Sequence, residues 1–311
     1  MARFDVALGF DANYAPHAAA VIASVARHAK DAQFRFLLLH EGVARSVQLQ
    51  IEALAPQSAF VWIEVGEEDV PAFEARRHLT RSTLYRLGLE RLAPADCERI
   101  LYLDADITVL GDIRGLWRCD LQGCAIGAVA DSLLNHKYPG VPFHQRWKLP
   151  EGQYFNAGVL LIDLAKVRAE NAFSRAMRFV AEHDHDLPFN DQDALNWTFW
   201  NAWRPLSPVW NVQRPQAAFW EARELPAEMQ LQGQAPLIVH YTGPEKPWLS
   251  TGYHPWSWAY WESLAHTPFL AAVAQQHGVR KLDRLRLLAR WLKRRPPRTS
   301  LFGGAILSTL R

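Results

Sequence analysis

The first 117 residues alternate between apolar runs of strand length and segments whose apolar residues recur at helical spacing. The runs that predict strands are Phe4–Phe10, Phe34–His40, Phe60–Val65, Arg99–Asp104 and Ile107–Leu110. The segments that predict helices are Ala18–His28, Val47–Leu54, Ser82–Leu92 and a short helix around Ile113–Trp117. This alternation predicts an α/β fold whose ligand lies at the carboxyl ends of the strands.

The second half is less regular. We predict strands at Cys124–Val129 and Phe155–Ile162 and helices at Ala165–Ala181 and Asp191–Trp200. Residues 132–150 show no clear period and predict a long loop of the kind that folds over a ligand. Ten of the 13 tryptophans lie at or beyond position 197. They either fill a core or stack on the flat faces of sugar rings, and the sequence leaves both open.

Charge is distributed unevenly along the 311 residues. Residues 280–311 hold ten Lys and Arg and one acidic residue, whereas residues 1–279 hold 24 basic and 31 acidic residues. A nucleic-acid-binding protein would spread positive charge over a folded face, so this distribution argues against that class. It indicates an enzyme body with an electrostatic attachment at one end.

Several absences predict a cytoplasmic protein. No stretch approaches 18 consecutive apolar residues, so we expect no transmembrane span. Asp5 and Asp11 would interrupt the apolar region of a signal peptide, so the first residues predict a strand. Cys97, Cys119 and Cys124 are odd in number and lack metal-ligand spacing, which predicts free thiols in a reducing cytosol.

The strongest local signal is an acidic pair, Asp104 and Asp106, at the end of an apolar strand. The Asp-x-Asp spacing alone is weak, because it also occurs at 184/186 and 191/193. Only the first pair is flanked by apolar residues on both sides. Two carboxylates at the end of a buried strand repel each other and are costly unless a cation neutralises them. A turn at Ala105 would let both reach one divalent ion.

A second signal is the stretch from Leu237 to Trp248. His240 ends an apolar strand, Gly243 permits a tight turn, and Lys246 follows in a loop. An imidazole beside two carboxylates suits an ion such as Mn²⁺, and a lysine suits phosphate. A single histidine after a strand is also often structural, so this stretch is suggestive only together with the acidic pair.

Two further stretches place polar groups near strand and helix ends. Tyr154–Ile162 puts the amide of Asn156 at the mouth of a strand. Asn190–Asn196 gathers polar groups at the start of a helix, where helix capping and the helix dipole explain them as well as ligand binding does.

These stretches, taken in order over about residues 4–262, resemble glycosyltransferase family eight, especially the bacterial lipopolysaccharide galactosyl- and glucosyltransferases. The resemblance rests on Phe10–Tyr14, Leu84–Leu87, Leu101–Asp106, Phe155–Gly158, Asp191–Asp193 and His240–Trp248. It implies a GT-A fold, an α/β architecture with a central mixed, mostly parallel sheet flanked by helices. One departure is Ala12, where the family often has a second acid.

The resemblance also implies residue roles. Mn²⁺, or Mg²⁺ in its place, would be held by Asp104, Asp106 and His240. The UDP-sugar donor would be bound by Gly9, Asp11, Asn13, Tyr14, Asp104, Ala105, Gly243 and Lys246, with Asp11 and Asn13 at the base and ribose. The catalytic groups around the donor hexose would be Arg86, Asn156, Asp191 and Gln192.

The implied activity is retaining transfer of galactose or glucose to a saccharide or glycolipid acceptor in lipopolysaccharide or lipooligosaccharide core synthesis. No clear pair of carboxylates is left for a double displacement, since Asp104 and Asp106 are assigned to the metal. We therefore expect the acceptor to attack from the face that UDP leaves. Gln192 and Asp191 would stabilise the sugar cation.

We expect two parts, a GT-A domain over residues 1–265 and a basic amphipathic segment over 266–311. Between Arg280 and Arg298, leucines recur at helical intervals among arginines. Such a helix would attach the protein peripherally to the anionic inner face of the membrane, and the plainer alternative is a solvated terminal helix.

Two other functions fit parts of the sequence. Asp104–Val109 matches the first motif of haloacid-dehalogenase phosphatases, in which Asp104 would be the nucleophile. That motif normally opens its domain, whereas about a hundred residues of α/β pattern precede it here. The other alternative is a catalytically silent module that only binds nucleotide sugars.

Overall fold

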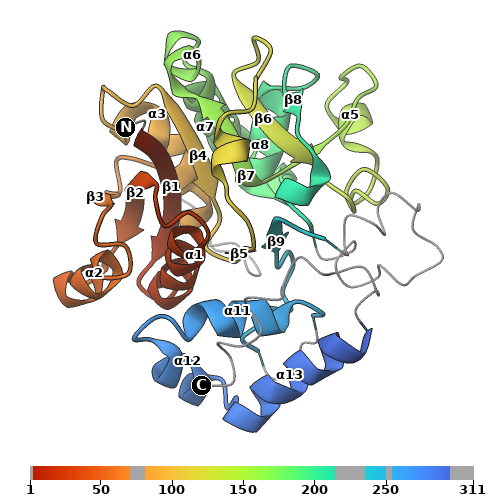
Figure 1. Cartoon of the computed structure of the whole chain (residues 1–311). Coiled ribbons are helices and arrows are strands. Elements are labelled where there is room, and N and C mark those ends of the chain that lie inside the picture. Colours follow the sequence, from red (N-terminus) through yellow and green to blue (C-terminus); the bar gives the residue numbers. More distant parts are fainter. Residues whose placement is uncertain (1–2, 71–80, 214–234, 250–253, 295–311) are drawn as a thin grey trace.

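The structure, a computed structural model, describes residues 3–70, 81–213, 235–249 and 254–294. A seven-stranded sheet with the order β3-β2-β1-β4-β7-β6-β8 runs through its centre (Figure 1). Its strands are β1 (Arg3–Asp11), β2 (Gln33–Glu41), β3 (Ala59–Glu64), β4 (Arg99–Leu103), β6 (Ile126–Ala130), β7 (Phe155–Asp163) and β8 (Arg204–Pro205). Strands β3, β2, β1 and β4 are parallel, and β7 pairs antiparallel with β4 and β6. The predicted mixed, mostly parallel sheet is confirmed.

A separate two-stranded ribbon extends from this sheet. It pairs β5 (Ile107–Val109) antiparallel with β9 (Ile238–His240), two segments about 130 residues apart in the chain. This pairing joins the acidic stretch after β4 to the histidine near the end of the chain.

Helices cover both faces of the central sheet. Successive side chains of a strand point to opposite faces, so strands that are apolar throughout make both faces of the sheet apolar. One face, with Val6 and Leu8, packs on α1 (Ala15–His28) and α2 (Arg45–Glu52). The other, with Ala7 and Tyr102, packs on four further helices. These are α3 (Leu89–Leu92), α6 (Leu164–Ala169), α7 (Ala172–His183) and α8 (Asn190–Thr198).

Two predicted helices differ from the structure. The segment 82–92 begins as a 3₁₀ helix (Arg81–Gly88) and becomes α-helical only at Leu89. In a 3₁₀ helix residues three apart align, so Thr83 and Arg86 both face the main cavity. The segment 165–181 is two helices, α6 and α7, because Asn171 adopts a φ of 49° and ends the first.

Residues 132–150 form the predicted long connection, with one short helix, α5 (Phe143–Arg146). A small hydrophobic cluster of Leu134, Tyr138, Phe143 and Tyr154 fixes this connection to the start of β7. Other short elements are α4 (Arg114–Trp117) and the 3₁₀ turns Asp184–Asp186 and Pro208–Trp210.

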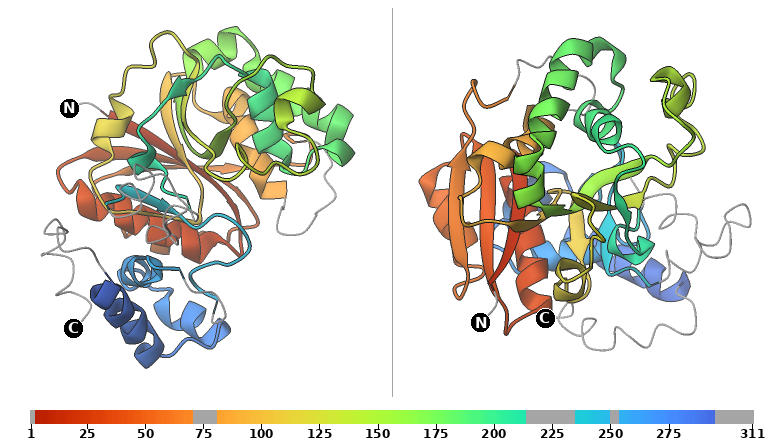
Figure 2. Two further views of the ribbon diagram at one scale, coloured as in Figure 1. Left: turned by 90° about the vertical axis from the view of Figure 1, so that its right-hand side faces the viewer. Right: turned by 90° about the horizontal axis from the view of Figure 1, so that it is seen from above.

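The last described helices, α11 (Ser257–Leu264), α12 (Leu270–Gln276) and α13 (Lys281–Arg294), lie together at one end of the molecule, beyond α1 (Figures 1 and 2). Trp256, Trp258, Trp261 and Trp291 are buried among them. For these tryptophans, core packing is therefore the correct alternative rather than stacking on sugar. The division at residue 265 stays a prediction, and one apolar cluster includes residues on both sides of it.

The structure also bears on the predictions of thiols and membrane spans. Cys97, Cys119 and Cys124 are free, as expected. None of the helices in the described ranges combines the length and apolarity that crossing a bilayer requires.

Candidate active site

Strand pairing brings the acidic pair and the histidine together. Asp104 directly follows β4, and its N–H donates to the carbonyl of Gly158 on β7 at 2.9 Å. Asp106 directly precedes β5, whose Ile107 is paired with His240 on β9. The N–H of Tyr241 donates to the carbonyl of Asp106 at 3.0 Å and fixes the same register. The predicted convergence of Asp104, Asp106 and His240 is thus present.

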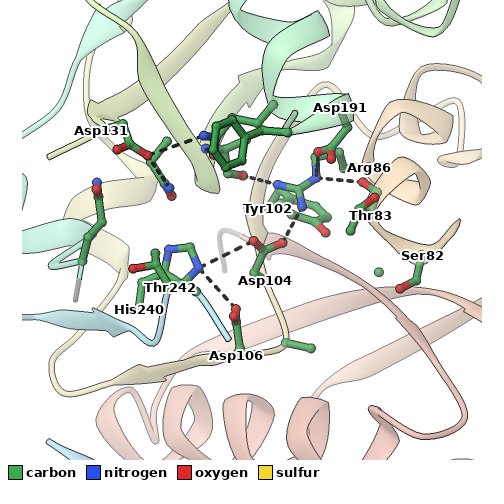
Figure 3. Close-up of a pocket in the computed structure, with 18 of the residues that line it drawn as sticks. Ser82, Thr83, Arg86, Tyr102, Asp104, Asp106, Asp131, Asp191, His240 and Thr242 are labelled. Atoms are coloured by element: carbon green, nitrogen blue, oxygen red, sulfur yellow. Dashed lines mark hydrogen bonds and ion pairs between the residues drawn. The ribbon is translucent and has the colours of Figure 1, made fainter. Parts of the chain in front are cut away.

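The three side chains point to one spot (Figure 3). His240 Nε2 lies 3.3 Å from Asp106 Oδ1 and 3.8 Å from Asp104 Oδ2. One ligand atom from each residue lies within 4.8 Å of the other two. Two carboxylates and one imidazole are a donor set that suits Mn²⁺ and leaves positions for phosphate oxygens or water. In geometry and chemistry, the residues fit a divalent cation.

Fixed cations flank this acidic pair. The guanidinium of Arg86 donates to Asp104 Oδ1 at 2.8 Å and forms an ion pair with Asp191 Oδ2 at 2.9 Å. The ammonium of Lys246 pairs with Asp106. Burial would raise the pKa of Asp106, but Lys246 and His240 outweigh it and hold that pKa well below its ordinary value. Asp106 is therefore ready to bind a cation at neutral pH.

A cavity of about 480 Å³ opens above this cluster, within the range of small-molecule sites. Twelve of the fourteen residues predicted for the site line it. They are Gly9, Tyr14, Arg86, Asp104, Ala105, Asp106, Asn156, Asp191, Gln192, His240, Gly243 and Lys246. These twelve residues come from six separate segments of the chain.

Asp11 and Asn13 are not among the lining residues. The carboxylate of Asp11 accepts hydrogen bonds from the backbone N–H groups of Asn13 at 2.9 Å and Tyr14 at 3.0 Å. This turn starts α1 and presents Tyr14 to the cavity. Their predicted contact with base and ribose stays a prediction.

Opposite the acidic pair, α8 presents Asp191 and Gln192. Burial raises the pKa of Asp191 to about 7, even though Arg86 favours its ionised form. The carbonyl oxygen of Gln192 accepts from the N–H of Ala157 at 2.9 Å, which directs its amide nitrogen toward Asp131. The neighbouring Asp193 does not line the cavity. Its carboxylate accepts from the N–H of Phe189 at 2.8 Å and from the hydroxyls of Tyr138 and Tyr154, so it fixes the start of α8.

Sequence reasoning missed several lining residues, including Ser82, Thr83, Tyr102, Asp131 and Gln213. Asp131 directly follows β6, so the strand-end rule that found Asp104 could also have found it. Predicting that Thr83 faces the cavity would require knowing that this segment is a 3₁₀ helix. Gln213 lies in an irregular segment without a periodic pattern.

The loop that carries Lys246 is held by aromatic packing. The ring of His17 on α1 stacks on Trp248 with centroids 3.7 Å apart. His17 Nδ1 also lies 2.7 Å from the hydroxyl of Tyr260. The indole N–H of Trp261 donates to the carbonyl of Pro247 at 3.0 Å. These contacts hold the position of the loop before any ligand binds.

His17 gives a prediction about stability. Burial lowers its pKa to about 3, so it stays neutral in the folded protein while the unfolded chain takes up a proton below about pH 6.5. Its contribution to the free energy of unfolding should fall by about 2 kcal/mol between pH 7 and pH 5. Urea titrations at both pH values should show this decrease removed in His17→Gln. An equal decrease in the two proteins would contradict this account.

Comparison with known proteins agrees with the geometry. The chain is 29% identical over 83% of its length to general stress protein A of Bacillus subtilis, covering 91% of that protein. It is 26% identical over 85% of its length to a lipopolysaccharide 1,2-glucosyltransferase of Escherichia coli, covering 78% of it. Its fold matches the crystal structure of the galactosyltransferase LgtC in complex with donor and acceptor sugar analogs, with a TM-score of 0.75 and 27% identity. That match covers 85% of this chain and 96% of LgtC.

The fold and the site together define a glycosyltransferase of the GT-A class. The chain belongs to glycosyl transferase family 8, whose family model matches residues 5–252. This membership leaves no support for the phosphatase alternative, in which Asp104 would be a nucleophile. In the structure, one oxygen of Asp104 is held by Arg86 and the other faces His240.

Proposed function

We propose that the protein transfers a hexose, galactose or glucose, from a UDP-sugar to a saccharide acceptor with retention of anomeric configuration and dependence on Mn²⁺. Mg²⁺ is the alternative ion. The observation that carries this proposal is the convergence of Asp104, Asp106 and His240 at one side of a cavity of about 480 Å³. The similarity to a lipopolysaccharide 1,2-glucosyltransferase supports an acceptor of the lipopolysaccharide kind, and we propose lipopolysaccharide or lipooligosaccharide core synthesis as the role.

The donor diphosphate would lie between the acidic pair and the loop of Lys246. A divalent ion held by Asp104, Asp106 and His240 would supply Lewis-acid stabilisation of the departing diphosphate. Lys246 would add a fixed cation. Gly243 would allow a close backbone approach because it has no side chain, and its φ of +81° is one that glycine adopts readily. The ion pair of Lys246 with Asp106 means that Lys246 must exchange that partner for phosphate.

The hexose would then face Arg86, Asn156, Asp191 and Gln192. With the metal-binding carboxylates assigned, Asp191 is held by Arg86 and Gln192 is an amide, so neither forms a free nucleophile–acid pair. We propose attack by the acceptor hydroxyl from the face that UDP leaves, with the leaving phosphate oxygen taking its proton. Asp191 and Gln192 would stabilise the developing sugar cation.

The test is a panel of UDP-sugars with and without Mn²⁺. We expect slow UDP release from UDP-galactose or UDP-glucose alone, faster release with a saccharide acceptor, and an α-linked product by NMR. Chelation with EDTA should abolish release and added Mn²⁺ should restore it. A rate of UDP release that is unchanged by EDTA would contradict metal dependence. Binding of a UDP-sugar without any release of UDP from it would indicate a catalytically silent module.

We further propose that α13 attaches the protein to an anionic membrane surface at the cytoplasmic leaflet. Leu288 and Trp291 of α13 are buried against the rest of the protein, so attachment would depend on its exposed basic side chains. Truncation before α13 would remove those core residues and confound the test. Charge substitution within α13 is therefore the sharper experiment.

Neutralising Lys281, Arg286 and Lys293 to Gln should weaken binding to phosphatidylserine vesicles about 100-fold, at about 1 kcal/mol for each charge. The matched control neutralises Lys30, Lys137 and Arg175, three exposed basic residues outside α13. Equal vesicle binding by the wild type and the α13 variant would contradict membrane attachment and support the alternative that α13 is a solvated terminal helix.

A further inference from the structure

Behind His240, the buried amide side chains of Asn211 and Asn156 continue a hydrogen-bonded line, of which His240 and Asn156 line the cavity. Asn156, Asn211 and His240 are 5%, 0% and 4% exposed. His240 Nδ1 lies 3.0 Å from Asn211 Oδ1, and Asn211 Nδ2 donates to Asn156 Oδ1 at 2.9 Å. The backbone N–H of Gly158 also donates to Asn156 Oδ1, at 3.0 Å.

The direction of every bond in this line follows from its fixed end. A backbone N–H can only donate, so the atom of Asn156 that faces Gly158 must be its oxygen. The other end of that amide is then the nitrogen, and it donates to the carboxylate of Asp131 at 3.1 Å. Because Asn156 presents oxygen, Asn211 must present its NH₂ group there and its own oxygen to His240. That oxygen can only accept, so His240 Nδ1 must carry a proton.

We propose that Asn211 is a positioning residue that keeps a proton on Nδ1 of His240 and so leaves Nε2 as the ligand atom for the divalent cation. This inference rests on the metal-dependent function proposed above. Nε2 is the ring atom that faces Asp104 and Asp106. Outer partners of this kind orient ligand histidines, and their loss commonly weakens metal affinity about 10- to 100-fold.

The backbone holds Asn211 and His240 together independently of their side chains. The N–H of His240 donates to the carbonyl of Val212 at 3.0 Å, and the N–H of Val212 donates to the carbonyl of Ile238 at 2.9 Å. Val212 also forms a β-bridge with Val239. A variant at Asn211 should therefore lose the orienting bond while the strand that carries His240 stays in place.

Two variants separate the bonds of Asn211. Asn211→Leu removes both hydrogen bonds of the amide while the side chain keeps a similar volume. Asn211→Asp keeps an oxygen that accepts from His240 Nδ1. Mn²⁺ affinity, measured by electron paramagnetic resonance of the free ion, should fall about 10- to 100-fold in Asn211→Leu and be largely retained in Asn211→Asp. Asn135→Leu is the control, because the amide of Asn135 bonds only to backbone atoms. It should bind Mn²⁺ like the wild type.

A second readout needs neither metal nor activity. Long-range ¹H–¹⁵N NMR of the metal-free protein, with the His240 signals assigned by their loss in His240→Gln, should show a proton on Nδ1 in the wild type and Asn211→Asp. In Asn211→Leu the proton should move to Nε2, toward Asp106. Thermal unfolding verifies that each variant is folded.

The outcomes are distinguishable. Native Mn²⁺ affinity and a native Nδ1 proton in folded Asn211→Leu would overturn the role of Asn211. Absence of Mn²⁺ binding by the wild type would overturn the proposed function instead, while the NMR comparison would still decide whether Asn211 sets the protonated nitrogen.

Discussion

Asp106→Asn should lower the rate of sugar transfer by about 1,000-fold, equivalent to about 4 kcal/mol of transition-state stabilisation. The substitution keeps the shape of the side chain but removes the carboxylate that faces both His240 and Lys246. Metal affinity should fall with it, because one of three protein ligands becomes a weak one. Initial rates of UDP release at saturating donor and increasing Mn²⁺ would measure both effects.

A matched control comes from a second Asp-x-Asp sequence. Asp186→Asn makes the same substitution at an exposed residue that does not line the cavity. It should leave the rate within about twofold of the wild type, since surface substitutions usually change little. Near-native transfer by Asp106→Asn at all Mn²⁺ concentrations would show that this carboxylate does not hold the ion.

Gly158→Ala should have a comparable effect for a steric reason. A Cβ on Gly158 would lie 2.1 Å from Cε1 of His240 and 2.9 Å from Oδ2 of Asp104. His240 or the strand must therefore move, which displaces two metal ligands by the addition of one methyl group. We expect Mn²⁺ binding and transfer activity to be lost, with a stability cost of about 1–3 kcal/mol from overpacking.

The control for this substitution is Gly115→Ala in α4. A Cβ there would meet only the side chain of Trp210 at 3.5 Å, an ordinary contact. Because alanine favours a helix over glycine by about 1 kcal/mol, this variant should be as active as the wild type and at least as stable. A Gly158→Ala protein that binds Mn²⁺ normally would show that His240 tolerates displacement.

The strands of the fold could be predicted where the local sequence pattern is enough to specify a strand. Phe4–Phe10 and Phe34–His40 are almost wholly apolar, so their burial on both faces of a sheet was predictable, and they form β1 and β2. Helix winding was harder to predict. The 3₁₀ helix at residues 81–88 depends on contacts with distant segments. The break between α6 and α7 depends on the φ angle of one residue, Asn171.

The candidate site was predicted unevenly for a related reason. Asp104 follows an apolar strand, and a local pattern is enough to find it. Asn211 is defined by the bridge between Val212 and Val239, a contact that no local pattern contains. The burial of the C-terminal tryptophans likewise follows from the packing of α11 and α13 on each other, which composition alone does not determine.

The antiparallel course of β7 has a practical consequence for engineering. Its first residues, with Asn156 and Gly158, lie at the end of the sheet where the parallel strands finish. The residues that line the cavity therefore gather at that end of the sheet. The turns at the opposite edge, such as residues 29–32 and 53–58, lie far along the strands from every catalytic group. Surface turns of this kind accept insertions, so a fluorescent tag or an affinity peptide belongs there. An insertion within β7 just before Gly158 would instead shift the alternation of that strand and turn Gly158 away from His240 and Asp104.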